Sequence, residues 1–310
     1  PGPQIERGSN MSERPTRQRW SLLPQRPPSP SQIEQRVSRR LSSYAGVMGL
    51  LILAVLVLLA IAPGLFAPYD PTETIGRPLQ KPSSGFILGT NDIGQDLLSE
   101  LIWATRASLS IGLIVGFLAV IAGTIVGLVA GYTSGVPGAL LMRLTDLTLA
   151  LPFLPLVILL SAYLGPSQSN VILILAFVSW AGPARLIRSR VLSLLTEPYI
   201  EAAQAVGSSR RRNLFVHIWP GVRFIALVQL LLVASAAILA EASLSFLGLG
   251  DPSAKSWGTM LYFARASGAF LTDAWRWWVL PAGMMITLTV LSLALIGYTA
   301  EEVLEPGLRT

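Results

Sequence analysis

Long apolar segments alternate with shorter polar segments along almost the whole chain. As helices that rise about 1.5 Å per residue, the apolar segments are long enough to cross a hydrocarbon layer roughly 30 Å thick. The pattern therefore predicts an all-α, polytopic membrane protein with six transmembrane helices. The expected spans are residues 44–66, 108–130, 141–163, 171–187, 222–247 and 277–300.

The polar segments predict how the chain is divided. Residues 1–43 are rich in Pro, Ser, Arg and Gln with few apolar anchors, which predicts a largely disordered cytoplasmic tail. The first transmembrane helix, 44–66, lacks a small-residue cleavage site after a short apolar core, so we expect an uncleaved span. A periplasmic segment at 67–104 follows, and residues 105–310 should form the transmembrane domain, with a cytoplasmic loop at 188–220.

Local signals predict three features within these regions. Asp92 is expected to cap an amphipathic helix over 92–105. Pro152 and Pro155 should kink the third span near its centre. Small residues at spacings of four and seven in the second span should let helices approach closely. These residues are Gly112, Gly116, Gly123, Gly127 and Gly131.

Composition agrees with a bilayer protein. The chain is 52% hydrophobic and 13% charged, whereas soluble proteins average about 25% charged residues. Its net charge of +6 comes from basic residues clustered in alternate loops, which indicates positive-inside topology and not nucleic-acid binding. The N-terminal tail and the 188–220 loop hold these arginines, so both termini should be cytoplasmic. Trp275, Trp277 and Trp278 are expected to mark the outer interface.

The composition offers few residues for catalysis or metal binding. The chain has no Cys, which excludes disulfides, a thiol nucleophile and a thiolate metal site. His217 is the only His, which removes most His-based metal sites. We therefore expect no catalytic residue and no metal ligand in this chain.

The most informative stretch is a polar island at 197–220 between very apolar segments. Pro198 suits the first turn of a helix, Thr196 is a plausible cap before it, and an Ala-rich run continues the helix. Gly207 can end it in a left-handed conformation, after which Ser208 or Ser209 can cap a second short helix. The prediction is a helix-turn-helix on the cytoplasmic membrane face.

This island closely resembles the cytoplasmic EAA loop of ABC importer permeases, whose pattern is Glu-Ala-Ala, three residues, Gly, and then a hydrophobic-Pro pair. The matching residues are Glu201, Ala202, Ala203, Gly207 and Pro220. Other stretches resemble the dipeptide, oligopeptide and nickel permeases in particular. They are LGTNDIGQDLLS at 88–99, EASLSFLGLG at 241–250, SWG at 256–258 and EPGLR at 305–309, with Gln95 standing where Arg is usual.

The resemblance implies the type I ABC importer permease fold and the second (C-type) permease subunit. It implies a heterodimer with a homologous permease subunit, two ATP-binding subunits, and an extracytoplasmic binding protein, in the lipid of a bacterial or archaeal inner membrane. No cofactor is expected on this chain: ATP and Mg would bind the partners, since no Gly-x-x-x-x-Gly-Lys-Ser/Thr sequence is present. Peptides are the expected substrate, with nickel chelates, glutathione-like and other small solutes left open.

The resemblance also implies roles for individual residues. Glu201 would contact the ATPase, Gly207 would set the turn, and Ala202 and Ala203 would allow close approach. Arg211 and Pro220 complete the expected coupling set. The alternatives are a hairpin that merely joins two spans, a six-span channel or secondary transporter, and an intramembrane protease, for which no suitable His or Asp pair lies within a span.

Two charged positions in or near spans call for partners. Arg143 and Asp146 lie three residues apart and can pair on one helix face. Glu241 lies well inside the fifth span and is expected to face the protein interior or a wet path. Glu241 and Ser243 are therefore candidates for the translocation path or gate, and a purely structural role for Glu241 stays open.

Overall fold

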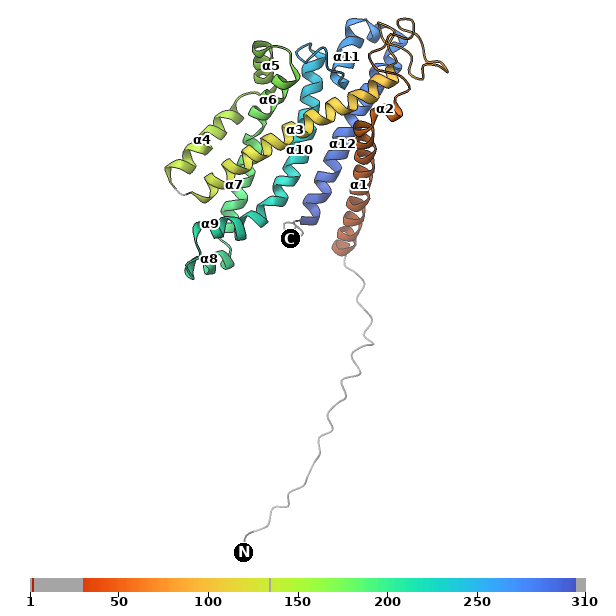
Figure 1. Ribbon diagram of the computed structural model, residues 1–310. Coiled ribbons are helices and arrows are strands. Elements are labelled where there is room, and N and C mark those ends of the chain that lie inside the picture. Colours follow the sequence, from red (N-terminus) through yellow and green to blue (C-terminus); the bar gives the residue numbers. More distant parts are fainter. Residues whose placement is uncertain (1, 3–29, 134, 305–310) are drawn as a thin grey trace. The chain divides into compact units, whose positions relative to one another are not determined.

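The computed structural model describes residue 2, residues 30–133 and residues 135–304 (Figure 1). The chain divides into two compact units, Pro1–Arg40 and Leu41–Thr310. Most of the first unit lies outside the described residues, and so does most of the tail predicted at 1–43. Helix α1 nevertheless begins at Pro30.

Helices account for nearly all regular structure in the described residues, which confirms the all-α prediction. The one β-bridge that these residues contain joins Thr90 and Asp96. The α-helices are α1 (Pro30–Ile61), α2 (Pro63–Phe66), α3 (Leu97–Tyr132), α4 (Val136–Ala150), α5 (Phe153–Leu164), α6 (Gln168–Ser179), α7 (Ala181–Leu195), α8 (Pro198–Ala205), α9 (Arg210–Arg212), α10 (Trp219–Phe246), α11 (Trp257–Ala266) and α12 (Val279–Leu304). A π-helix, η1 (Asn213–Ile218), joins α9 to α10, and two 3₁₀ turns, η2 (Ala269–Leu271) and η3 (Asp273–Arg276), precede α12.

Five helices of the described chain are long and apolar enough to cross a membrane, and the bent pair α4 and α5 raises the number to six if it counts as one span. The pair does lead from one end of the bundle to the other. The α3–α4 turn shares a pocket with the end of α7, whereas the start of α6, which follows α5, shares a pocket with the α10–α11 loop. We therefore count six crossings, as predicted.

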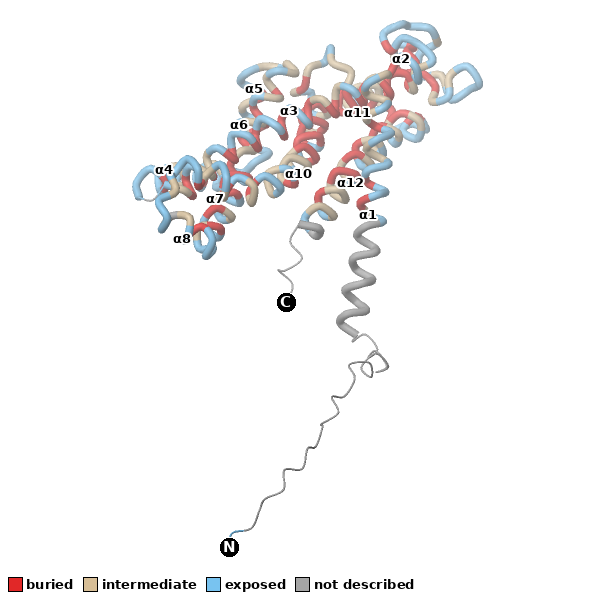
Figure 2. Tube along the Cα trace, turned by 60° about the horizontal axis from the view of Figure 1, so that its bottom comes forward, coloured by how far each residue is buried: buried red, intermediate tan, exposed pale blue. Residues whose placement is uncertain are grey.

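Helix α3 is the centre of the packing and contacts both α7 and α10 (Figure 1). Its small residues make these approaches possible: a Cβ at Gly116 would lie 3.0 Å from a backbone oxygen of α10, and one at Gly127 would lie 2.7 Å from a backbone oxygen of α7. The predicted glycine stripe is thus confirmed as a packing surface. Buried residues run along α3 and α10 in Figure 2.

The start of α3 differs from the prediction. Its N-cap is Asp96, whose carboxylate accepts from the Ser99 N–H at 2.8 Å, and Asp92 does not cap a helix. The expected amphipathic helix and the expected second span form one continuous helix. Asp96 is the N-cap because it directly precedes the apolar run and its carboxylate accepts from the N–H of the third residue after it.

The third span is broken, not kinked. Helices α4 and α5 meet at 87° around Leu151 and Pro152. A residue before proline is disfavoured in the α conformation, and Leu151 is accordingly extended, with ψ of 136°. Pro155 lies in the first turn of α5, where its missing N–H removes no helical hydrogen bond.

Two further predictions are corrected by packing, and one helix was not anticipated. Asp146 pairs with Arg185 of α7 at 2.5 Å and not with Arg143, because α4 lies along α7. Trp278 is buried in the core with Trp257, so of the three tryptophans it does not mark an interface, whereas Trp275 is exposed. The polar segment after α10 contains a helix, α11, which Ser256 starts with a capping box.

Candidate functional site

Helix α8 projects from the end of α7 as part of a helical hairpin. It begins at Pro198, as predicted, but Thr196 lies too early to cap it. Thr196 instead ends α7, where its hydroxyl donates to the Ser193 carbonyl at 2.8 Å. The predicted hairpin is therefore present with a different first cap.

The turn after α8 depends on Gly207. Its φ is +87°, and the Ser208 N–H donates to the Ala203 carbonyl at 3.0 Å. This is the hydrogen bond of a Schellman motif, in which a left-handed residue ends a helix. Ser209 then caps α9 by accepting from the Arg212 N–H at 3.3 Å. Two predictions for this turn are confirmed: Gly207 is left-handed, and a serine, Ser209, caps the next helix.

The link from α9 to α10 is a π-helix, which the sequence analysis missed. Its signal is Pro220, because proline has no N–H for the carbonyl four residues earlier and its ring clashes with that carbonyl. The chain widens just before the proline, and the Trp219 N–H bonds the Leu214 carbonyl five residues back. Pro220 thus shapes the link and is half-buried at the start of α10.

Among the described side chains of α8, Ile200 is the buried one that anchors the helix to the membrane helices. Ile200 is 0% exposed and belongs to a hydrophobic cluster with Ile187 and Val191 of α7, Ile218 of η1 and Val222 of α10. The sequence analysis did not single out Ile200, although it is the one large aliphatic residue within α8. Because of this cluster, a force on α8 acts directly on α7 and α10.

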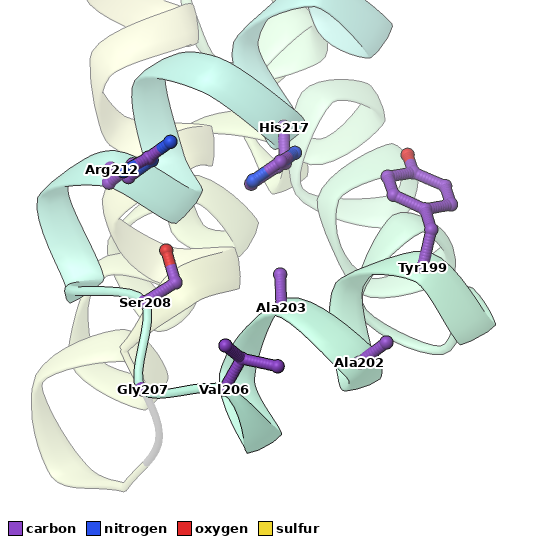
Figure 3. Close-up of a pocket in the computed structure, with 8 residues that line it drawn as sticks. All are labelled: Tyr199, Ala202, Ala203, Val206, Gly207, Ser208, Arg212 and His217. Carbon is purple, nitrogen blue, oxygen red and sulfur yellow. The ribbon is translucent and has the colours of Figure 1, made fainter.

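A hollow opens between α8 and η1, with a volume of about 530 Å³ available to the centre of a water molecule. We call it the α8 hollow. Figure 3 shows His217 from η1 and Ala203 from α8 on opposite sides of it, with Tyr199 at one end and Arg212 and Ser208 at the other. The ring centres of Tyr199 and His217 are 6.3 Å apart.

The residues predicted to couple to an ATPase are mostly exposed on this hairpin. Glu201, Ala202, Gly207 and Arg211 are exposed, and Ala203 is half-buried in the wall of the hollow. Two apolar side chains are exposed beside them: Tyr199 at 50% and Val206 at 89%. Both side chains line the α8 hollow, so the hairpin presents apolar as well as charged surface to solvent.

Glu241 and Ser243 do not lie together. Glu241 is 3% exposed, and its Oε1 accepts from Ser245 Oγ at 2.7 Å and from Ser256 Oγ at 2.8 Å. It therefore faces the protein interior, as predicted. Ser243 is half-buried, and its hydroxyl donates to the Leu239 carbonyl of its own helix at 2.8 Å.

Gln95 belongs to a buried polar network at the start of α3. Lys255 Nζ lies 2.8 Å from Gln95 Oε1 and 3.0 Å from Glu100 Oε1, so a lysine of the α10–α11 loop neutralises the buried Glu100. This network ties the segment before α3 to the loop after α10. Among the described residues, no group of three or more His, Cys, Asp or Glu side chains is arranged to hold a metal.

Two family models match this sequence. Residues 123–310 match the binding-protein-dependent transport system inner membrane component, and residues 34–82 match the N-terminal TM domain of oligopeptide transport permease C.

Individual relatives match over most of their length. The Di/tripeptide transport system permease protein DppC of Pseudomonas aeruginosa (strain UCBPP-PA14) is 38% identical over 269 residues, which cover 84% of this chain and 88% of that protein. The Dipeptide transport system permease protein DppC of Escherichia coli (strain K12) is 38% identical over 271 residues, covering 85% and 89%. Its namesake in Haemophilus influenzae is 34% identical over 271 residues, covering 85% and 90%.

Proposed function

Because the chain belongs to the family of binding-protein-dependent transport system inner membrane components, we propose that it carries peptides of two or three residues across the inner membrane. The chain is a permease subunit of an ABC importer and not an enzyme. It forms the translocation path together with a homologous permease subunit, and a binding protein delivers the peptide from outside. ATP and Mg bind two partner ATPase subunits.

One observation carries the coupling part of this proposal: the exposed α8 hairpin is fixed to two membrane helices by the buried Ile200. The hairpin exposes Glu201, Ala202 and Arg211 to a partner. A rigid helix that seats in a groove of the ATPase would move as one body with that subunit. Movement of α8 would then shift α7 and α10, and the close contacts of both helices with α3 would spread the shift through the bundle.

The charge distribution supports the orientation. Exposed Arg210, Arg211 and Arg212 form α9 of the hairpin, and cytoplasmic loops of membrane proteins carry such an excess of basic residues. The ATPase therefore approaches α8 from the cytoplasm, and both chain termini lie on that side. The α10–α11 loop and the segment before α3 face the binding protein.

The substrate class rests on the relatives, whose names specify dipeptides or di- and tripeptides. The residues that line the translocation path are proposed from the structure of this chain. Ser243, half-buried on α10, is proposed to face the path, whereas the burial and two hydroxyl donors of Glu241 support a positioning role beside it.

Reconstitution tests this function. The chain, its partner permease and both ATPase subunits are placed in liposomes with ATP inside, and the binding protein is added outside. We expect ATP-dependent accumulation of labelled dipeptide that fails when any component is omitted. Accumulation of a nickel chelate or glutathione, with no competition by dipeptides, would refute the substrate, and dipeptide uptake without the ATPase subunits would refute the mechanism.

A further inference from the structure

A small cavity lies where the end of α10, the α10–α11 loop and the start of α6 meet. The volume available in it to the centre of a water molecule is about 10 Å³. One water molecule occupies about 10–15 Å³, so a cavity with this much room for its centre can hold one. Any organic ligand is far too large for it.

The buried carboxylate of Glu241 borders this cavity with one oxygen unused. Oε1 accepts two hydroxyls, from Ser245 and Ser256, but Oε2 is buried and has no hydrogen-bond partner among the described residues. A carboxylate has about four acceptor sites, and leaving a buried one unpaired is costly. Glu241 lines the cavity, so a molecule held there lies beside its carboxyl group.

A second carboxylate borders the same cavity. Asp251 follows the end of α10, and the hydroxyl of Ser253 donates to its Oδ1 at 2.6 Å. That bond, helped by backbone N–H donors of Ser253, Gln168 and Ala254 and opposed by partial burial, lowers the pKa of Asp251. Asp251 is therefore ionised near neutral pH and can only accept hydrogen bonds.

We propose that this cavity is a binding site for one ordered water molecule that bridges Glu241 Oε2 and the carboxylate of Asp251 by hydrogen bonds. A molecule that bridges two carboxyl groups in so small a cavity must be able both to donate and to accept hydrogen bonds, and water does both. The water joins α10 to the α10–α11 loop, and Asp251 in turn accepts from the backbone N–H of Gln168 at the start of α6.

The walls of the cavity argue against other occupants. Two carboxylates repel an anion. Hard cations take about six or more oxygen ligands, whereas the buried side chains of Ile111 and Val171 make part of this wall aliphatic. Glu241 is thus a positioning residue: it holds Ser256, the cap of α11, and through the water it is joined to the α10–α11 loop.

The direct test is a structure of the assembled transporter at a resolution that shows ordered waters, determined once in sodium chloride and once with thallium replacing sodium. We expect one peak within hydrogen-bond distance of Glu241 Oε2 with the same weak density in both salts. An empty cavity in a map that shows other buried waters would overturn the proposal. Density that strengthens with thallium would also overturn it, because the occupant would be a cation.

A double-mutant cycle tests the same site in solution. Val171→Ile adds one methyl to the cavity wall and should displace the water, so the melting temperature of the purified complex should fall by several degrees. Glu241→Gln supplies its own amide donor toward Asp251 and makes the water dispensable, so Val171→Ile should cost much less in that background. Val157→Ile, at a fully buried valine of the same cluster outside the cavity, should cost the same in both backgrounds. Equal costs of Val171→Ile in the two backgrounds would contradict the proposal.

Discussion

Gly207 offers a test of coupling that acts through backbone conformation. Its φ is +87°, and no atom lies within 4 Å of a Cβ built there, so a side chain meets strain but no clash. An L-residue in the left-handed region costs roughly 1–2 kcal/mol, and the cost is higher for a β-branched one. A change of this size shifts a conformational equilibrium about 5- to 30-fold. Gly207→Val should therefore release the turn between α8 and α9.

The assay is the number of ATP molecules hydrolysed per peptide imported by the reconstituted transporter. For Gly207→Val we expect this ratio to rise severalfold while the chain still inserts and assembles. Gly207→Asn should stay near the original ratio, because Asn tolerates the left-handed conformation. The matched control is Gly268→Val, at a left-handed glycine with φ of +74° and equally open space in the turn before η2. A ratio for Gly207→Val equal to those of Gly207→Asn and Gly268→Val would refute the role of this turn.

Three other predictions follow from burial and orientation. Ile200→Ala deletes a fully buried anchor, at a cost of about 2–5 kcal/mol, so the ATPase subunits should co-purify less well with the chain, and undiminished co-purification would contradict the anchor role. Gly127→Leu should lower the yield of folded protein, since its Cβ would lie 2.7 Å from a backbone oxygen of α7, whereas Gly182→Leu, which meets nothing within 4 Å, should not; equal yields would contradict the α3–α7 contact. A cysteine at Ser83 should react with an impermeant maleimide from outside and one at Ser208 should not, and the reverse pattern would overturn the orientation.

The sequence was sufficient for features that local chemistry decides. The spans follow from apolar length, and the turn at Gly207 follows from the left-handed conformation that glycine permits. Motif resemblance identified the family. The glycine stripe of α3 was read correctly because small residues at spacings of four and seven have few uses other than close packing.

Features decided by tertiary contacts were not accessible in this way. The partner of Asp146 could not be chosen without knowing that α4 lies along α7, and Trp278 could not be distinguished from an interfacial tryptophan. Asp96 and Asp92 both precede the same apolar run, and only the backbone after Gly94, whose φ is +85°, decides between them. The burial of Ile200 could not be predicted because a single isoleucine in a short helix forms no helical hydrophobic pattern.

Contact between α8 and an ATPase subunit is the central claim, and cross-linking measures it most directly. The chain has no cysteine, so a single cysteine at the exposed Ala202 is the one site in this chain that a short photoreactive thiol-specific cross-linker can label. In the assembled transporter, illumination should give one product that contains this chain and an ATPase subunit, and nucleotide should change its yield. A cysteine at Leu164, at the opposite end of the bundle, should give no such product. Absence of an ATPase product from position 202, in a complex that hydrolyses ATP and imports peptide, would contradict the account.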